Sequence, residues 1–527
     1  MEEIFTKIKP REYQEKIFLT CLERNTLIVL PTGLGKTLIA LMVTVQRMKD
    51  FPGKKVVFLA PTRPLAEQHL NYFKKNLPEL FASMELFTGK VNPPERRKIW
   101  QTADIIFSTP QCVANDLKNR LYNLNDVCLL IEDEAHRCVK NYDYTYIAAS
   151  YKQQAPTGIQ RIIGMTASPG SEAQKIKEIC KNLSIEEVEL RSRISPDVKG
   201  YLQELEFEKI IVDFPEDFNK IRLALQKIID NYIEELRARN VLFGAVNKIK
   251  LIELQRSMMA SISRGNQNFG YFSAVSACSQ AIKLQHALEL LETQTLDGVN
   301  KYLKGLFDQA SKKKSKGVVK LVASTEFNFI FEGVTELIAK GREHPKVEQI
   351  LEIVKREKQE NKNVKLIVFT QFRETAGHLS KKINEISGVT SKVFIGQAKK
   401  SNSKGEQTGL SQKEQKNIIE DFSNGKINVI CATSIAEEGL DIPEVNAVIF
   451  YETIPSAIRA IQRTGRTARL KKGKLILLIT KKTRDESNYY VSRSREKKMT
   501  SAIETVKKDL INNSRGLSEK NPQKKLF

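Results

Sequence analysis

The stretch Leu30–Thr37, LPTGLGKT, has the residue types and spacing of a loop that cradles phosphate groups. It ends the apolar run TLIVL, and a strand that leads through a glycine-rich turn into a helix surrounds one anion with backbone N–H groups. In such a loop the glycines let the backbone approach the phosphates, the lysine reaches the β and γ oxygens, and the threonine hydroxyl ligates Mg²⁺. Leu30 stands where the full pattern G-x-x-x-x-G-K-[ST] has its first glycine. The expected nucleotide-binding residues of the loop are Thr32, Gly33, Gly35, Lys36 and Thr37.

Acidic residues follow a second apolar run further along the chain. The run VCLLI, Val127–Ile131, leads directly into the letters EDEAH. Ligands of parallel sheets bind beyond the carboxyl ends of the strands. Asp133 is therefore placed to hold Mg²⁺, and Glu134 to polarise the attacking water. An acidic turn at a strand end, without a catalytic role, is the alternative interpretation.

Short β-branched runs alternate with helical patterns over the first 200 or so residues of the chain. Continuous apolar strands separated by helices are typical of a parallel sheet that helices cover on both faces. From about 201 to 340 the periodicity is helical, apart from one candidate strand at Lys209–Phe214, and strands then return. The other predicted strands are Thr26–Leu30, Val56–Ala60, Asp104–Thr109, Val127–Glu134, Arg161–Ser168, Lys365–Thr370, Lys392–Gly396, Ile427–Ser434, Ala447–Glu452 and Lys474–Thr480.

The predicted fold is α/β, with two tandem parallel-sheet domains and an all-helical insertion between them. We expect the first domain at 1–195, the insertion at 196–340, the second domain at 341–497, and a helix end with a flexible tail at 498–527. The polar stretch Ala398–Gln415 predicts an exposed loop. The chain after Asn512 lacks an apolar period and is predicted to be disordered.

The composition is strongly basic. Lysine and arginine number 85 against 62 acidic residues, a net charge of +23. Such an excess favours an acidic polymer as partner, because neutralised phosphates release counterions. The seven cysteines include no C-x-x-C pair, so neither a zinc site nor a disulfide framework is indicated. With no signal peptide and no apolar run long enough for a bilayer, we expect a cytoplasmic protein without a membrane partner.

Seven motifs follow one another along the chain: PTGLGKT, APTRPLA, STPQ, IEDEAH, MTASPG, ATSIAEEGLDIP and QRTGRTAR. In order and spacing they resemble the superfamily 2 helicases of the DEAH-box type. More narrowly, FLAPTRPLAEQH, REHPKVEQI and PSAIRAIQRTGRTAR are similar to the helicase half of archaeal Hef, a relative of the Fanconi anaemia group M translocase. The resemblance runs from about Lys9 to Lys498 and implies two RecA-like domains.

The resemblance implies ATP and Mg²⁺ as cofactors, and it assigns roles to single residues. Gln14 matches the glutamine that reads the adenine edge, and Asp441 matches the motif that touches the ribose. Thr37 and Asp133 match the residues that hold the metal ion. The residues that match the link between hydrolysis and DNA contact are His136, Thr166 and Ser168.

Arg466 and Arg469 match the arginine fingers of the second domain. Positive charge that reaches the γ-phosphate only when the domains close makes hydrolysis conditional on closure, and such a finger contributes roughly 10³–10⁵ in rate. A basic helix face that also includes Arg463 is the alternative interpretation. The implied catalytic residues are Lys36, Asp133, Glu134, Gln462, Arg466 and Arg469.

The resemblance also implies DNA contacts in every domain. Contacts to the phosphodiester backbone use amides and hydroxyls, so they position DNA without reading its sequence. In the insertion the run Ser311–Gly317, SKKKSKG, is either a phosphate-contacting loop or a solvated turn. The implied contacts are Arg63, Gly89, Thr109, Pro110, Thr370, Gly396 and Thr433, with Lys312, Lys313, Lys314 and Lys316 in the insertion.

The resemblance implies an ATP-dependent motor that remodels forked or branched DNA, with 3′ to 5′ polarity. A double-stranded RNA-stimulated ATPase and a platform that recruits a separate nuclease or the sliding clamp are the alternatives. No nuclease signature follows the second domain, so we expect no nuclease activity. The ending Gln523–Phe527, QKKLF, has the Gln-x-x-Leu spacing of clamp-binding tails, and a frayed terminus is the alternative.

Overall fold

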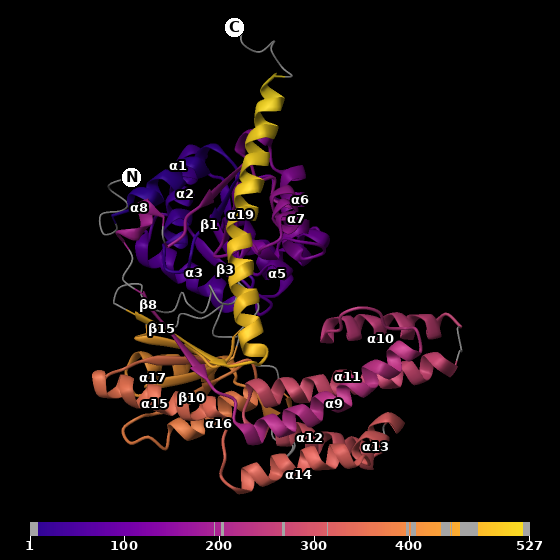
Figure 1. The fold of residues 1–527 in the computed structure, drawn as a ribbon. Coiled ribbons are helices and arrows are strands. Elements are labelled where there is room, and N and C mark those ends of the chain that lie inside the picture. The colour runs from indigo at the N-terminus through magenta and orange to yellow at the C-terminus, as the bar shows by residue number, and fades with distance from the viewer. Residues whose placement is uncertain are drawn as a thin grey trace.

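Two parallel sheets organise the chain (Figure 1). The computed structural model describes residues 9–193, 195–201, 205–265, 269–313, 315–396, 400–401, 407–433, 443, 445–453 and 473–519. The first sheet has the order β3-β4-β2-β5-β6-β1-β7, and every pairing in it is parallel. Its strands are β1 Thr26–Val29, β2 Lys55–Leu59, β3 Met84–Phe87, β4 Ile105–Ser108, β5 Val127–Asp133, β6 Ile162–Thr166 and β7 Glu187–Leu190.

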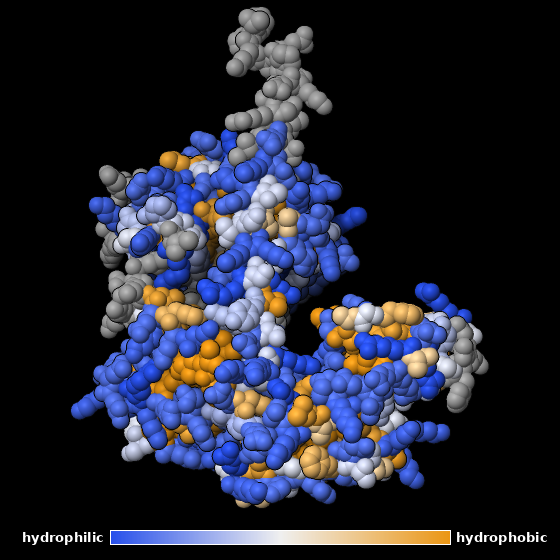
Figure 2. All heavy atoms as spheres, viewed as in Figure 1, coloured by the Kyte–Doolittle hydropathy of each residue, from blue (hydrophilic) through white to orange (hydrophobic). Residues whose placement is uncertain are grey.

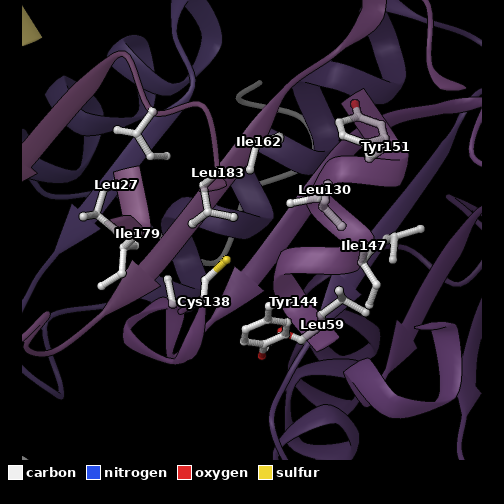
Figure 3. Close-up of a cluster of buried hydrophobic side chains, with 14 of the residues drawn as sticks. Leu27, Leu59, Leu130, Cys138, Tyr144, Ile147, Tyr151, Ile162, Ile179 and Leu183 are labelled. Carbon is white, nitrogen blue, oxygen red and sulfur yellow. Dashed lines mark hydrogen bonds between the residues drawn. The ribbon is translucent and has the colours of Figure 1, made fainter. Parts of the chain in front are cut away.

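Helices cover both faces of the first sheet, as the continuous apolar strands predicted. Successive residues of β1 point to opposite faces: Leu27 packs with one core and Ile28 with the other. Figure 3 shows the first of these cores, where Leu130 of β5 lies near Ile147 and Leu27 of β1 lies near Ile179, both isoleucines coming from covering helices. The helices of this domain are α1 Glu12–Glu23, α2 Lys36–Asp50, α3 Arg63–Asn76, α4 Pro93–Thr102, α5 Pro110–Lys118, α6 Asp143–Gln154, α7 Ala173–Asn182 and α8 Pro196–Lys199, with 3-10 turns η1 Ala135–Arg137 and η2 Thr157–Ile159.

The five predicted strands of this domain are confirmed, but β3 and β7 were not predicted. Both lie at the edges of the sheet. An edge strand buries one flank only, and so tolerates charges such as Glu85, Glu187 and Glu189 that interrupt the apolar run. Their sequences, MELF and EVEL, therefore lack the continuous apolar character by which the central strands were recognised.

The second sheet has the order β10-β13-β9-β14-β15-β8, with parallel pairings throughout. All five predicted strands of this domain are confirmed. Its strands are β8 Leu205–Val212, β9 Leu366–Phe369, β10 Ser391–Phe394, β13 Val429–Ala432, β14 Ala447–Phe450 and β15 Gly473–Thr480. Its helices are α15 Pro345–Glu360, α16 Arg373–Ile383 and α17 Gln412–Ser423.

Strand β8 corrects the predicted domain boundary at 196. The sequence placed this segment in the insertion, whereas β8 pairs with β15 from Leu205 opposite Gly473 to Val212 opposite Thr480. The chain therefore adds an edge strand to the second sheet before it enters the insertion. The candidate strand Lys209–Phe214 overlaps only the last residues of the observed strand β8, Lys209–Val212.

The predicted loop Ala398–Gln415 is partly regular. Two short strands, β11 Lys400–Ser401 and β12 Gln407–Thr408, pair in an antiparallel arrangement. Helix α17 then begins at Gln412, because Ser411 and Glu414 form a reciprocal capping box that satisfies the first backbone N–H groups. The loop prediction is therefore wrong for the last residues of the stretch.

The insertion is a bundle of helices, as predicted. Their apolar faces form a core of their own, separate from the cores of the two sheets. Figure 1 shows the bundle as an arm beside the second sheet, with α10 on the side nearer to the first domain. Its helices are α9 Glu216–Ala238, α10 Lys248–Ser263, α11 Phe269–Thr293, α12 Leu296–Ser311, α13 Lys316–Val322 and α14 Thr325–Ala339.

One long C-terminal helix, α19 Arg484–Glu519, connects the two sheet domains (Figure 1). It contacts β15 of the second sheet and then α7 and β7 of the first domain. Met499, Ile503 and Val506 of this helix are buried in the first domain's core. The helix crosses the predicted boundary at 498 and passes Asn512, after which disorder was predicted. No helix in the described part of the chain has the length and apolar character to cross a bilayer.

The junction between insertion and second domain contains a protonatable group, His378. Its Nδ1 lies 2.9 Å from Asp297 Oδ2 of α12, and its Nε2 lies 2.9 Å from Glu343 Oε1. The carboxylates of Glu343 and Asp297 raise the pKa of His378 above its ordinary value, although burial opposes them.

This raised pKa predicts that the junction weakens with rising pH. The stabilisation is complete below the unfolded-state pKa of histidine and is lost as pH rises through the folded-state value. Because Asp297 is 62% exposed, we expect about 1 kcal/mol or less. Thermal unfolding of the wild type and His378→Gln should differ most near pH 5.5 and little near pH 8.5. A difference that does not depend on pH would contradict the charged junction.

Candidate functional site

The glycine-rich loop lies where the sequence placed it, between β1 and α2. Gly33 and Gly35 have φ angles of 88° and 79°, in the left-handed region that glycine adopts readily. Leu30 N donates to Thr166 O at 3.1 Å, which joins the start of the loop to β6. Lys36 Nζ donates to Leu30 O at 2.8 Å, so the lysine lies across the loop. Thr37 follows in the first turn of α2, beside the expected phosphate position.

Helix α1 contacts this loop through the side chains of Tyr13 and Gln14. Tyr13 Oη and Gln14 Nε2 both donate to Leu34 O, at 2.8 and 3.1 Å. The backbone N–H of Arg11 donates to Gln14 Oε1 at 2.9 Å. A Cβ at Gly35 would clash with the Gln14 amide. Gln14 therefore lies at the predicted nucleotide site, buried against the loop, while its contact with adenine stays a prediction.

Asp133, the predicted metal ligand, ends β5 and is held by a residue that sequence reasoning missed. Asp133 Oδ2 lies 2.8 Å from His69 Nε2, and both side chains are more than nine-tenths buried. Burial alone would raise the pKa of Asp133, but the hydrogen bond and charge of His69, with Lys36 nearby, outweigh it and lower that pKa. The carboxylate is thus kept ionised, as a Mg²⁺ ligand must be. Oxygen donors at Asp133 and Thr37 fit this ion.

The pair Asp133–His69 predicts a strong effect of His69 on metal binding. Groups that hold metal ligands in place typically contribute a factor of about 10–100 in metal affinity. We expect His69→Ala to raise the Mg²⁺ concentration for half-maximal ATPase activity by about that factor. His69→Gln, which keeps a donor, should recover part of the loss. An unchanged Mg²⁺ midpoint in His69→Ala would contradict the positioning role.

The predicted coupling residues form a connected chain that starts at the acidic motif. Glu134 adopts a left-handed conformation with φ of 52°, and its Oε2 lies 3.2 Å from His136 Nδ1. His136 Nδ1 is 3.1 Å from Thr166 Oγ1, which accepts from Ser168 N at 3.1 Å. Ser168 Oγ then donates to Met499 Sδ of α19 at 2.8 Å. The structure therefore brings all these residues together and adds the C-terminal helix to them.

The predicted DNA-contacting residues of the two domains lie at the carboxyl edges of the sheets. In the first domain they follow β2, β3 and β4, and in the second they follow β9, β10 and β13. Thr370 is buried, and its Oγ1 donates to Phe372 O at 2.9 Å, so this hydroxyl closes a turn. Arg373 Nη2, which the sequence did not single out, donates to Gly396 O at 3.3 Å. The residues at these edges are Arg63, Gly89, Thr109, Pro110, Thr370, Gly396 and Thr433.

In the insertion, Lys312 and Lys313 are exposed in the turn after α12. Lys313 has a positive φ of 49°. Several predicted residues lie outside the described part of the chain: Lys314, Asp441, Gln462, Arg466, Arg469 and the tail Gln523–Phe527. The expected arginine fingers and ribose contact therefore stay predictions.

Family models match all three parts of the chain. The "DEAD/DEAH box helicase" model matches residues 11–176, and the "Helicase conserved C-terminal domain" model matches 345–471. A third, "Putative ATP-dependent RNA helicase, helical bundle", matches 217–335 within the insertion. The solved helicase domain of Hef from Pyrococcus furiosus is 39% identical, with a TM-score of 0.70, over 93% of this chain and 99% of that one. The chain is a superfamily 2 DEAD/DEAH-box helicase.

Curated relatives of this helicase carry both DNA and RNA in their names. A Methanocaldococcus jannaschii protein named "Putative ATP-dependent RNA helicase MJ1505" is 36% identical over 95% of this chain. The mouse "Fanconi anemia group M protein homolog" is 29% identical over 94% of it. The chain spans 61% and 26% of the lengths of these two relatives. The predicted membership of the superfamily, with Hef and Fanconi anaemia group M as relatives, is confirmed.

Proposed function

We propose that this helicase is an ATP- and Mg²⁺-dependent motor that moves on DNA, with 3′ to 5′ polarity, and remodels forked or branched DNA in fork repair. The observation that carries the proposal is the similarity to the Hef helicase domain over 93% of the chain, helical insertion included. A Neurospora crassa protein named "ATP-dependent DNA helicase mph1" is also similar over 93% of the chain. The net charge of +23 suits a phosphate polymer.

In this proposal the predicted site residues have distinct roles. Lys36 and the loop bind the β and γ phosphates. Asp133 and Thr37 would hold Mg²⁺, which would offset the negative charge of the phosphates. Glu134 orients and polarises the attacking water. Gln462, Arg466 and Arg469 reach the γ-phosphate on closure of the second domain.

The contacts around Ser168 connect the acidic motif to α19, and thereby offer a physical link between ATP hydrolysis and closure of the second domain. Glu134, His136, Thr166 and Ser168 lead to Met499 of α19, and α19 also contacts β15 of the second sheet. A change at the acidic motif and a movement of the second domain would therefore act on the same helix. This supports a coupling of hydrolysis to domain movement through α19.

A second candidate function is an RNA-stimulated ATPase. It is favoured by the printed description of the helical-bundle model and by the name of the Methanocaldococcus relative. Backbone contacts of the predicted type do not by themselves distinguish DNA from RNA, because they use phosphates rather than bases. The DNA motor and the RNA-stimulated ATPase are distinguished only by which polymer stimulates ATP hydrolysis more.

Steady-state ATPase activity with a panel of polymers tests the proposal. The panel contains no nucleic acid, single-stranded DNA, duplex DNA, a three-way fork, a four-way junction and duplex RNA. We expect the largest stimulation with the fork or the junction. Greater stimulation by duplex RNA would replace the proposal with the RNA candidate, and indifference to every polymer would favour a recruiting platform.

The proposal also places the protein in the cytoplasm beside the nucleoid.

A separate nuclease, and the sliding clamp through Gln523–Phe527, are its proposed protein partners. Deletion of 523–527 should abolish clamp binding in calorimetry without changing ATPase activity. Clamp binding that survives the deletion would refute this role of the tail.

A further inference from the structure

A groove of about 620 Å³ opens on the insertion, between α10, α11 and the start of α13. We call it the insertion groove; its walls include Arg256 and Met259 from α10, Phe272 and Gln280 from α11, and Lys316 and Gly317 from the first turn of α13. Its volume falls in the range of small-molecule sites, about 300–1,000 Å³. Among the described residues, Lys316 is the one predicted DNA contact that lies in its walls.

The groove offers an exposed aromatic face. Phe272 and Met259 are each 50% exposed, although both belong to the class of residue that usually packs inside. Exposed aromatic rings in nucleic-acid-binding proteins act as platforms for bases, since every base has a π face. A flat, apolar occupant would cover both side chains.

A buried amide lies against the same groove. Gln280 is 2% exposed, and its Oε1 has no hydrogen-bond partner among the described residues. Buried polar groups are usually hydrogen-bonded, so an unpartnered amide in a groove indicates a polar ligand. Any side chain at Gly317 would clash with this amide and with Ser276 Oγ, so glycine lets the start of α13 lie close to α11.

The rim of the groove is positively charged. Arg256 and Lys316 are exposed in its walls, and Lys312 and Lys313 are exposed in the turn beside it. No acidic side chain occurs among the described residues that line it. An anionic occupant with a flat apolar part and a hydrogen-bonding edge fits these three features, and a nucleotide has all of them.

The position of the groove suits DNA at a branch. Figure 2 shows a deep notch between the first domain and the insertion arm, and Figure 1 shows α10 on the side of the arm that faces this notch. Because α10 forms one wall of the insertion groove, the groove lies on the arm that borders this notch.

We propose that the insertion groove holds one unpaired nucleotide of branched DNA. Its base stacks on Phe272, its edge hydrogen-bonds to the Gln280 amide, and its phosphates lie beside Arg256 and Lys316. This inference rests on the proposed function and deepens it: the insertion recognises the unpaired nucleotide at a branch and not the duplex arms alone.

Binding of two matched forks tests the proposal. Both have the same arms; one has a single unpaired nucleotide at the branch and the other is fully paired. The wild type should bind the first more tightly. Phe272→Ala should lower that affinity about tenfold, the usual scale for loss of one base stack, and leave the fully paired fork and linear duplex unaffected. Phe272→Trp should retain the preference.

Phe329→Ala provides the matched control. Phe329 lies on α14 of the same insertion, is 54% exposed, and does not line the groove, so its loss should change no affinity. Equal binding by Phe272→Ala and wild type, or an equal loss on linear duplex, would overturn the groove proposal.

The same wild-type protein is assayed for ATPase activity with the forks. If forks do not stimulate it, the proposed function fails; if they do and Phe272→Ala binds normally, only the groove inference fails.

Discussion

Replacement of Lys36 with alanine is expected to lower the rate of ATP hydrolysis about 10²–10³-fold, the cost of removing one preorganised positive group from a developing negative charge. In the structure this lysine lies across the glycine-rich loop, with its Nζ on Leu30 O. Its loss removes charge at the β and γ phosphates and leaves the backbone N–H groups of the loop. DNA binding should persist, because the predicted DNA residues lie on other loops.

Lys49→Ala is the matched control for this prediction. Lys49 is exposed near the end of the same helix, α2, away from the loop, so its removal should leave hydrolysis unchanged. Turnover and fork affinity are measured on both variants, by a coupled ATPase assay and by fluorescence anisotropy. Substantial turnover by Lys36→Ala would contradict the assignment of the loop, and a parallel loss of fork binding would mean that the substitution disturbs more than the phosphate contact.

The nucleotide loop and acidic motif could be predicted because their function depends on local spacing. Gly35 and Lys36 follow the apolar strand β1 in the loop that enters α2, Asp133 ends the apolar strand β5, and the parallel sheet brings these two strand ends to the same edge. His69 could not be predicted in the same way. It lies on α3, and its approach to Asp133 results from the packing of this helix on the sheet. The motif APTRPLAEQH did contain it, without any indication of its partner.

The domain boundaries were harder to predict, because they depend on pairings between distant parts of the chain. Strand β8 precedes the insertion in sequence and pairs with β15, which follows it. Helix α19, near the end of the chain, packs against α7 and β7 of the first domain. Local periodicity reports whether a segment is helical or extended, but not which sheet it joins. The errors over β8 and α19 therefore concern the domain to which a segment belongs, whereas most segments were correctly predicted as helix or strand.

A buried ion pair, Lys346–Asp485, lies where the insertion, the second domain and α19 meet. Lys346 Nζ lies 2.7 Å from Asp485 Oδ2, and both side chains are completely buried. The ammonium also donates to Thr293 O at 2.8 Å and lies 4.5 Å from the centre of the Tyr451 ring. Thr293 ends α11, Lys346 begins α15 and Asp485 begins α19, so the pair joins the insertion, the second domain and the C-terminal helix.

Lys346→Met is expected to lower the free energy of unfolding by about 3–5 kcal/mol, the usual cost of leaving one partner of a buried pair alone. Burial raises the pKa of Asp485 and Lys346 opposes this rise, so the remaining carboxyl group would be buried without its cation. Urea unfolding followed by circular dichroism measures the loss. Lys355→Met, an exposed position on the same helix, should change stability by no more than about 0.5 kcal/mol.

The double variant Lys346→Met/Asp485→Leu separates two explanations of that loss. If the cost comes from an uncompensated buried carboxyl group, removal of both partners should restore most of the stability, because an apolar pair of similar volume often replaces a buried ion pair without penalty. If the lysine instead acts mainly through Thr293 O and the Tyr451 ring, the double variant should remain as unstable as Lys346→Met. A single variant as stable as Lys355→Met would show that the junction does not depend on the pair, and α19 would then be held to the second domain chiefly by its apolar contacts.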